Sequence, residues 1–248
     1  FVTIFVSVIV TFLHSFNYGS IDLMLVFMLV VGSIVGVQVG QKLGEKIESN
    51  LSDRVMNILD IIKVPTFWVL IFIFSLQFCA NLGVYSHIFP YTTDLGFDVN
   101  KAGLAVSVGA LGAAFGKIVF GKLIDLVSAR KTLSTSIIIQ GLGIILVSFF
   151  SSYYLLLVAI FIMSLGLGGT VPLMNILFSK TFSPTNFGKA LGIAVPFMVP
   201  IQVVGAPLSG WLYDINGNYD LAFYLNTAVC FLAFIFVFFL NIPNNKQS

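Results

Sequence analysis

Long apolar runs dominate this sequence, and short polar segments interrupt them. A helix needs about 20 apolar residues to cross the hydrocarbon core of a bilayer, and isolated strands cannot satisfy their backbone in lipid. The pattern therefore predicts an all-α fold, a polytopic membrane helix bundle with about eight crossings. Their approximate bounds are Phe1–Leu13, Ile21–Val39, Pro65–Tyr85, Ala102–Ile124, Leu133–Phe150, Leu155–Phe178, Ala190–Leu212 and Leu221–Leu240.

The composition supports an integral membrane protein. Hydrophobic residues make up 58% of the chain and charged residues only 9%, whereas a soluble domain carries about 25% charged residues. The sequence has no paired catalytic acids, phosphate-binding glycine loop or metal-ligand spacing, so we expect no enzyme, no cofactor and no nucleic-acid partner. Cys79 and Cys230 both lie in apolar runs and are expected to be buried as small hydrophobic side chains.

The basic residues predict an orientation. If the segment before Pro65 is cytoplasmic and the helices alternate, only Lys101 lies outside and Lys117 lies within a crossing. The outer loops then carry aspartates, and excess Lys and Arg in the remaining loops is the asymmetry of the positive-inside rule. We expect both termini in the cytoplasm and a bacterial cytoplasmic (inner) membrane. The residues placed inside are Lys42, Lys46, Arg54, Lys63, Lys122, Arg130, Lys131, Lys180, Lys189 and Lys246.

Residues 1–62 differ in character from the rest. Gly32, Gly36, Gly40 and Gly44 recur every four residues, which is typical of a close-packing helix face, and an amphipathic stretch follows. This segment resembles the C-terminal part of the sulfite exporter (TauE/SafE) family; the alternative is a helix-packing motif of any transporter. The chain starts in an apolar run without Met, so we expect it to be the remainder of a longer product.

A short polar loop joins two of the later apolar runs. It contains Gly121, Asp125, Arg130 and Lys131, in the pattern G-x-x-x-D-x-x-x-x-R-K. The pattern resembles the cytoplasmic loop motif of the major facilitator superfamily, and the alternative is an ordinary basic turn. We expect Asp125 to anchor this loop through Arg130 or through a neighbouring helix end.

Three further motifs strengthen that resemblance. They are the segments 94–102, 187–192 and 205–223, and the last matches G-x-P-x-x-G-W-x-x-D-x-x-G-x-Y-x-x-x-F of monocarboxylate/oxalate porters. The resemblance implies that residues 63–243 form the C-terminal six-helix half of that fold and that 244–248 form a cytoplasmic tail. It also implies that an N-terminal half is a missing partner.

Lys117 is the sharpest candidate for substrate binding, because charged residues within a crossing are costly and are functional candidates by default. It resembles the basic position that porters of this branch use toward a carboxylate. Some porters of this branch also carry an acidic residue four positions before the basic one, whereas this sequence has Ala113 there. The departure puts a proton-coupling ion pair at this place in doubt. The alternative is that Lys117 snorkels to the cytoplasmic interface.

Other polar residues within the crossings are secondary candidates. Gln77, Asn81 and Tyr85 recur every four residues and form one stripe, which predicts cavity lining or interhelical hydrogen bonding. His87 follows the stripe and is either a titrating group or an interfacial loop residue. The remaining candidates are Asn175 and Gln202 for substrate binding, and Gly168, Gly169, Pro172, Pro207 and Gly210 for gating or packing.

The function expected from these features is secondary transport of a small organic anion, such as a monocarboxylate, by alternating access. A proton is the candidate coupling ion, and the lipid bilayer is the expected environment. Two alternatives stay open. The chain is a truncated or fused membrane fragment without transport activity alone, or it is an anion exporter of the sulfite/sulfonate type.

Overall fold

The computed structural model describes residues 55–241. The chain divides into two compact units, Phe1–Arg54 and Val55–Ser248, and only the second contains described residues. The first two predicted crossings, and most of the segment that resembles the sulfite exporters, therefore lie outside the described residues.

The described part is built from helices alone. It contains no strand between residues 55 and 241, so the predicted all-α class is confirmed. The helices are α3 (Ile58–Ile62), α4 (Pro65–Tyr85), α5 (Ile88–Asp94), α6 (Val99–Leu126), α7 (Ala129–Phe149), α8 (Tyr153–Gly168), α9 (Thr170–Val203), α10 (Gly205–Asn216) and α11 (Asp220–Phe238).

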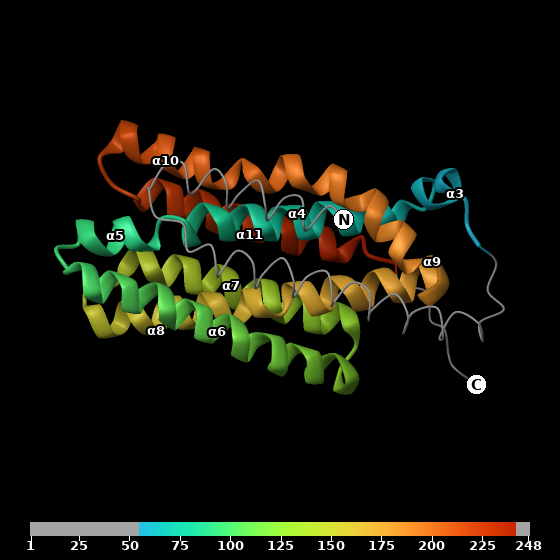
Figure 1. The fold of residues 1–248 in the computed structure, drawn as a ribbon, viewed down its shortest axis with the longest axis horizontal. Coiled ribbons are helices and arrows are strands. Elements are labelled where there is room, and N and C mark those ends of the chain that lie inside the picture. The colour runs from blue at the N-terminus through green and yellow to red at the C-terminus, as the bar shows by residue number, and fades with distance from the viewer. Residues whose placement is uncertain (1–54, 242–248) are drawn as a thin grey trace, which may run out of the picture. The chain divides into compact units, whose positions relative to one another are not determined.

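Five helical runs between residues 55 and 241 are long and apolar enough to cross a membrane. One of them, Tyr153–Asn216, has 64 residues, which at 1.5 Å per residue is about three times the thickness of a hydrocarbon core. It folds back on itself at Ser183, where φ is 62° and ψ is 159° and where Pro184 follows. Figure 1 shows α9 turning back at this elbow, so the run forms two arms that are each long enough to cross a membrane.

Three of these crossings are built from two helices each, which the apolar pattern alone did not predict. The breaks separate α4 from α5, α8 from α9 and α9 from α10. In each case a proline is the third residue of the second helix: Pro90, Pro172 and Pro207. A proline has no backbone N–H and removes the bond to the carbonyl four residues earlier, so each proline weakens the helix at its break.

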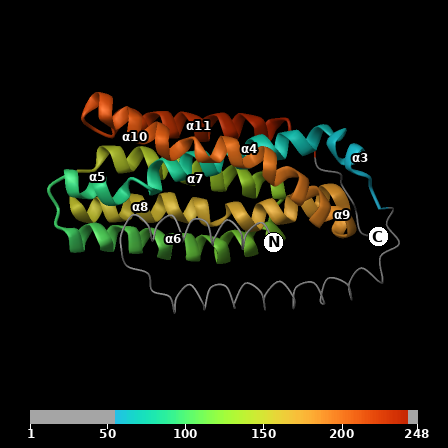
Figure 2. The same cartoon turned by 45° about the horizontal axis from the view of Figure 1, so that its top comes forward.

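Small residues let neighbouring crossings approach closely. A Cβ added at Gly112 of α6 would lie 2.7 Å from the Phe161 carbonyl oxygen of α8, and one at Gly168 would lie 2.8 Å from the Gly116 Cα. Figures 1 and 2 show α6 and α8 side by side along most of their lengths. Such small-residue crossings are typical of helix packing in membranes.

Aromatic residues fill the core between α4 and α9. The Phe67 ring packs edge-on against Phe178 at 6.4 Å and against Phe182 at 5.9 Å, and all three side chains are buried. Large apolar side chains also cover the outside of the bundle, including Leu111, Phe115, Ile118 and Phe231, each more than half exposed. A hydrophobic exterior of this extent is what a lipid environment requires.

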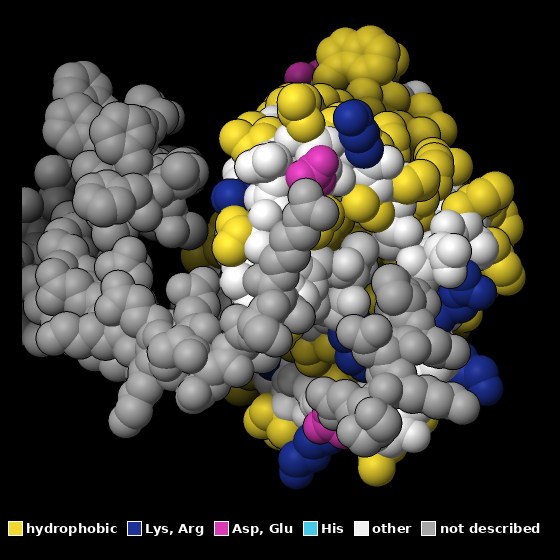
Figure 3. Space-filling model, turned by 90° about the vertical axis from the view of Figure 1, so that its right-hand side faces the viewer, with side chains coloured by type: hydrophobic (Ala, Val, Ile, Leu, Met, Phe, Trp, Pro, Cys, Tyr) yellow, Lys and Arg dark blue, Asp and Glu magenta, His cyan; other side chains and the backbone are white. Residues whose placement is uncertain are grey.

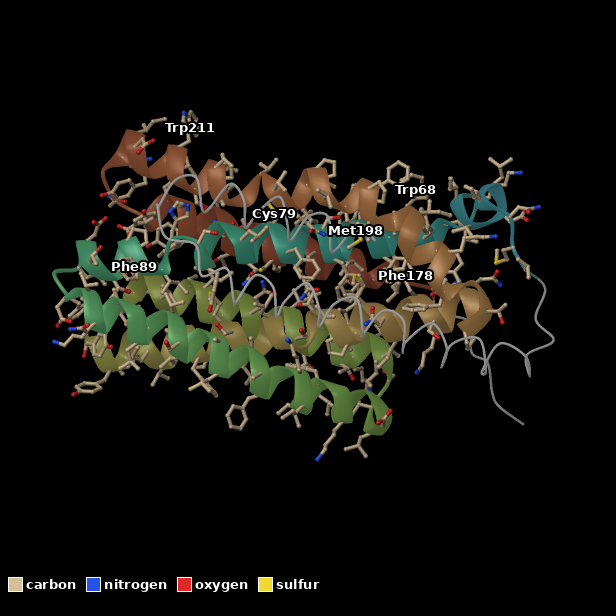
Figure 4. All side chains as sticks on the ribbon, in the orientation of Figure 1. Trp68, Cys79, Phe89, Phe178, Met198 and Trp211 are labelled. Atoms are coloured by element: carbon tan, nitrogen blue, oxygen red, sulfur yellow. The ribbon has the colours of Figure 1, made fainter. Side chains whose placement is uncertain are left out.

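The two ends of the bundle differ in charge. Basic residues gather where α3, the α6–α7 loop and the α9 elbow meet, and Figure 3 faces this end. Aspartates gather at the opposite end, where α5, α10 and the start of α11 lie. The two tryptophans, Trp68 and Trp211, lie toward opposite ends (Figure 4), as in the aromatic belts of membrane proteins. The chain is an integral membrane protein.

Candidate substrate site

The polar stripe on α4 points partly into the bundle. The Gln77 side chain is completely buried and Asn81 is 8% exposed, while Tyr85 is half-buried. Gln77 Nε2 donates to Gln140 Oε1 at 3.3 Å, and Gln140 Nε2 donates to the Gln77 carbonyl at 3.1 Å. This pair ties α4 to α7, as the interhelical alternative requires.

Several polar atoms in this interior have no hydrogen-bond partner within residues 55–241. They include Gln77 Oε1, Asn81 Nδ2 and Ser164 Oγ. A buried polar atom without a partner costs about 1–3 kcal/mol, so such atoms ordinarily hold water or a ligand. An acceptor, a donor and a hydroxyl therefore remain available along α4 and α8.

Tyr85 and Ser164 meet at α6. The Tyr85 hydroxyl donates to the Val106 carbonyl at 3.1 Å. A Cβ added at Gly109 would lie 2.8 Å from Tyr85 Cε2 and 3.2 Å from Ser164 Oγ, so only a glycine leaves room for both side chains here. The stripe thus reaches α6 at a point two turns before Lys117.

Lys117 is exposed and has no hydrogen bond or ion pair within the described part of the chain. It is nine residues from the end of α6 at Leu126, which is about 13 Å along the helix axis. The predicted crossing ended at Ile124, so Lys117 lies slightly deeper than the sequence indicated. No hydrogen bond within residues 55–241 joins Lys117 to Gln77, Asn81 or Tyr85, and an exposed lysine at this depth is also compatible with snorkelling.

The two remaining amides lie in different crossings. Asn175 precedes the Ser183 elbow and Gln202 follows it, and both are half-buried without a hydrogen bond in the described residues. Neither Asn175 nor Gln202 is therefore hydrogen-bonded to the polar stripe on α4. The α4 stripe instead meets Gln140 of α7, a residue that the sequence analysis missed. The available signal was that Gln140 is the only amide in the apolar run 137–147.

The glycines and prolines expected to gate or pack lie at helix breaks and close approaches. Gly168 and Gly169 flank the α8–α9 break, where a Cβ at Gly169 would lie 2.6 Å from the Phe120 ring. Pro172 follows that break and Pro207 follows the α9–α10 break. Gly210 leaves room for the His87 ring, 3.4 Å from the place of its missing Cβ.

The loop between α6 and α7 differs from expectation in one contact. Gly121 is half-buried, while Asp125, Arg130 and Lys131 are exposed. Arg130 does not pair with Asp125; its guanidinium donates to the Leu240 carbonyl, and the only ion pair between residues 55 and 241 joins Lys101 to Asp98. The guanidinium thus satisfies a carbonyl just beyond the end of α11, an ordinary use of a basic side chain at a helix C-terminus.

No group of three or more His, Cys, Asp or Glu side chains within residues 55–241 could hold a metal ion. Both cysteines are buried and free, at 7% and 1% exposure for Cys79 and Cys230. The interior of the described bundle therefore offers amides and hydroxyls for binding, and Lys117 lies on its exposed surface.

Comparison with known proteins gives consistent results. A profile described as Major Facilitator Superfamily matches residues 69–248. Monocarboxylate transporter 10 of Rattus norvegicus is 26% identical over 144 residues, covering 57% of this chain and 28% of the relative. The purine ribonucleoside efflux pump NepI of Escherichia coli is 28% identical over 151 residues, covering 58% of this chain and 38% of the pump.

The fold is also that of solved transporters. The structure of the Escherichia coli fucose:proton symporter FucP superposes with a TM-score of 0.64 at 16% identity, covering 74% of this chain and 44% of the symporter. This chain thus spans less than half the length of each of these proteins. Because a matching profile covers most of its length, the chain belongs to the Major Facilitator Superfamily.

Proposed function

We propose that this chain contributes the C-terminal half-bundle of a secondary transporter that carries a small organic anion by alternating access. The observation that supports the proposal is Lys117, an exposed cation inside a 28-residue apolar helix without an acidic partner in the described bundle. A lysine in a crossing costs about 2.5–3.5 kcal/mol near the bilayer centre. A carboxylate substrate is a partner that would offset this cost.

The test replaces Lys117 in a transporter that contains both halves. A hydrogen bond to a charged group contributes about 1.5–3 kcal/mol, and 1.4 kcal/mol is a tenfold change in affinity. Lys117→Gln should therefore weaken monocarboxylate uptake by about 10- to 100-fold, whereas Lys117→Arg should keep part of it. Lys122→Gln, an exposed lysine nearer the end of the same helix, is the matched control. Equal uptake by Lys117→Gln and the unmodified protein would show that Lys117 only snorkels.

A second candidate substrate class is an uncharged polyhydroxylated molecule such as a nucleoside or sugar. The free Gln77 Oε1 and Asn81 Nδ2 atoms favour it, because neutral donors and acceptors suit neutral hydroxyls and bases. Competition between a labelled monocarboxylate and a ribonucleoside separates the two. Suppose that the ribonucleoside inhibits uptake, and that this inhibition disappears in Asn81→Leu but persists in Lys117→Gln. That result would favour the neutral substrate class.

Several whole-protein features belong to the same proposal. A second six-helix half completes the transporter, a proton is the coupling ion, and both termini face the cytoplasm across a bacterial inner membrane. Residues 1–62 form a separate sulfite-exporter-like segment, 63–243 the transporter half and 244–248 a tail. Uptake measured with and without residues 1–62 tests whether that segment takes part in transport.

A further inference from the structure

His87 lies at the break between α4 and α5 and bonds to two other parts of the bundle. Its Nε2 is 3.0 Å from the Ala206 carbonyl oxygen of α10, and its Nδ1 is 3.2 Å from the Tyr219 hydroxyl, next to the start of α11. The two rings lie 5.2 Å apart. The His87 side chain is thus held by two hydrogen bonds. The sequence had left two interpretations of it open, a titrating group or an interfacial loop residue.

These contacts fix the tautomer of the neutral ring. A carbonyl oxygen can only accept, so Nε2 must carry a hydrogen and donate it to Ala206. In the neutral imidazole Nδ1 is then an acceptor, and the Tyr219 hydroxyl donates to it. The neutral ring therefore satisfies both of its nitrogens.

The same surroundings can satisfy the protonated ring. A second proton on Nδ1 makes that nitrogen a donor to the Tyr219 oxygen, and the Tyr219 hydroxyl must then donate elsewhere. Carboxylates lie near it: burial, followed by the charges of Asp94 and Asp214 and by Tyr213, raises the pKa of Tyr219 to about 12. The hydroxyl therefore keeps its own proton throughout the physiological range, and its oxygen can accept a hydrogen bond from a protonated Nδ1.

This end of the bundle carries more carboxylates than basic side chains. The single lysine at this end of the described bundle is Lys101, whose Nζ lies 3.7 Å from Asp98 Oδ2. The other aspartates of this end have no basic partner within residues 55–241. Among the described residues, the only titratable side chain bonded to His87 is Tyr219. The other titratable groups on the elements at this end are Tyr91 and Asp94 on α5, Asp98 and Lys101 at the start of α6, Tyr213 and Asp214 on α10, and Asp220 and Tyr224 at the start of α11.

The position of His87 connects two weak points of the helices. His87 is the N-cap residue of α5, at the α4–α5 break. Ala206 directly precedes Pro207, just beyond the α9–α10 break. Gly210 of α10 leaves the space that the ring occupies. A change in the hydrogen bonds of this one ring therefore acts on two crossings that are already interrupted.

We propose that His87 and Tyr219 form a proton-binding site that links the α4–α5 break to the α9–α10 break. The site takes one proton from solution onto His87 Nδ1, which reverses the hydrogen bond with Tyr219, so that the Tyr219 hydroxyl no longer donates to the ring. No bond other than N–H forms, and the proton leaves by the reverse step. The inference rests on the proposed transport function, for which it supplies the site of the coupled proton.

The first test observes the ring directly. The chain contains only two histidines, so in a His14→Gln variant with ¹⁵N-labelled histidine every imidazole signal belongs to His87. At about pH 8 we expect a protonated Nε2 and an unprotonated Nδ1, and at about pH 5 we expect both nitrogens to be protonated. Tyr219→Phe should change the Nδ1 signal and leave Nε2 as it was. A neutral ring protonated on Nδ1, or a ring that stays neutral at about pH 5, would overturn the proposal.

The second test measures the two helices. Spin labels at Phe89→Cys in α5 and Trp211→Cys in α10 occupy exposed positions, in a background in which Cys79 and Cys230 are alanine. The distance distribution should differ between about pH 8 and about pH 5, and His87→Gln, which cannot titrate, should abolish that difference. A pH response that persists in His87→Gln would contradict the link. Neither measurement requires substrate, so failure here is distinct from failure of the Lys117 test.

Discussion

The amides of Gln77 and Gln140 show what a polar residue can contribute inside this bundle. Each donates to the other's residue, and both side chains are completely buried. The spacing of Gln77, Asn81 and Tyr85 correctly placed a polar stripe on α4. It could not say which neighbour the stripe meets, because the partner lies 63 residues away and only the packing of α4 against α7 brings it close.

Removing both amides should therefore cost less than the sum of the losses from removing each one alone. Gln140→Met leaves the Gln77 amide without its partner and should lower the free energy of unfolding by about 1–2 kcal/mol. In the double variant with Gln77→Met, the loss should be smaller than the sum of the two single losses. Reversible unfolding in detergent measures all three. The control is Gln202→Met, which removes no described hydrogen bond; additive losses would show that the pair is not coupled.

Asp98 gives a prediction with a pH dependence. It begins α6, and its carboxylate accepts a bond from the Lys101 backbone N–H at 3.0 Å, which lowers the pKa of Asp98 below its ordinary 3.8. A lowered folded-state pKa means that the ionised carboxylate stabilises the fold above pH 3.8 and that this contribution disappears as the pH falls through the lowered value. Asp98→Ala should thus lower the melting temperature near neutral pH, and the difference from the unmodified protein should shrink in acid. A difference independent of pH would exclude the charge as its cause.

At the scale of the elements, hydrophobic runs predicted where helices cross but not where they break. Pro65 correctly marked the start of α4, and the loops near residues 95 and 128 fall where the polar residues cluster. The breaks before Pro172 and Pro207 lie within apolar sequence, where hydrophobicity carries no signal, whereas the break before Pro90 follows the polar residues Ser86 and His87. Of these prolines, the sequence analysis singled out Pro172 and Pro207, and a proline's missing N–H is the physical feature that all three breaks share.

The crossing of α6 and α8 offers a matched pair of glycine substitutions. Gly112→Ala would place a methyl group 2.7 Å from the Phe161 carbonyl oxygen, and overpacking of this kind costs about 1–3 kcal/mol. Gly103→Ala, on the same helix, meets nothing within 4 Å and should be neutral or stabilising by up to about 1 kcal/mol. Melting temperatures in detergent should thus fall for the first variant and not for the second. Equal shifts would mean that helix propensity, not the crossing, controls stability.

For the whole molecule, the sequence predicted the all-α membrane class, because composition and run length alone determine whether a segment can span lipid. It did not predict the elbow at Ser183, where φ is 62°, from any apolar pattern. It also expected Asp125 to anchor its loop through Arg130 or through a neighbouring helix end, and of these the pairing with Arg130 is absent, since the guanidinium bonds to the Leu240 carbonyl. Contacts between distant segments depend on the packing of the whole bundle, which no local pattern contains.

The arrangement of charge across the whole bundle leads to a test of its orientation. Basic side chains gather at the α6–α7 end and aspartates at the α10–α11 end, so the positive-inside rule places the first in the cytoplasm. With Cys79 and Cys230 replaced by alanine, Ser128→Cys and Asn218→Cys place one exposed thiol at each end. A membrane-impermeant maleimide applied to intact cells should label Asn218→Cys, and it should label Ser128→Cys only after the membrane is opened. The reverse pattern would invert the bundle and place Lys117 toward the outer face. A carboxylate would then reach it from outside, so the orientation decides the side from which any anion is taken up.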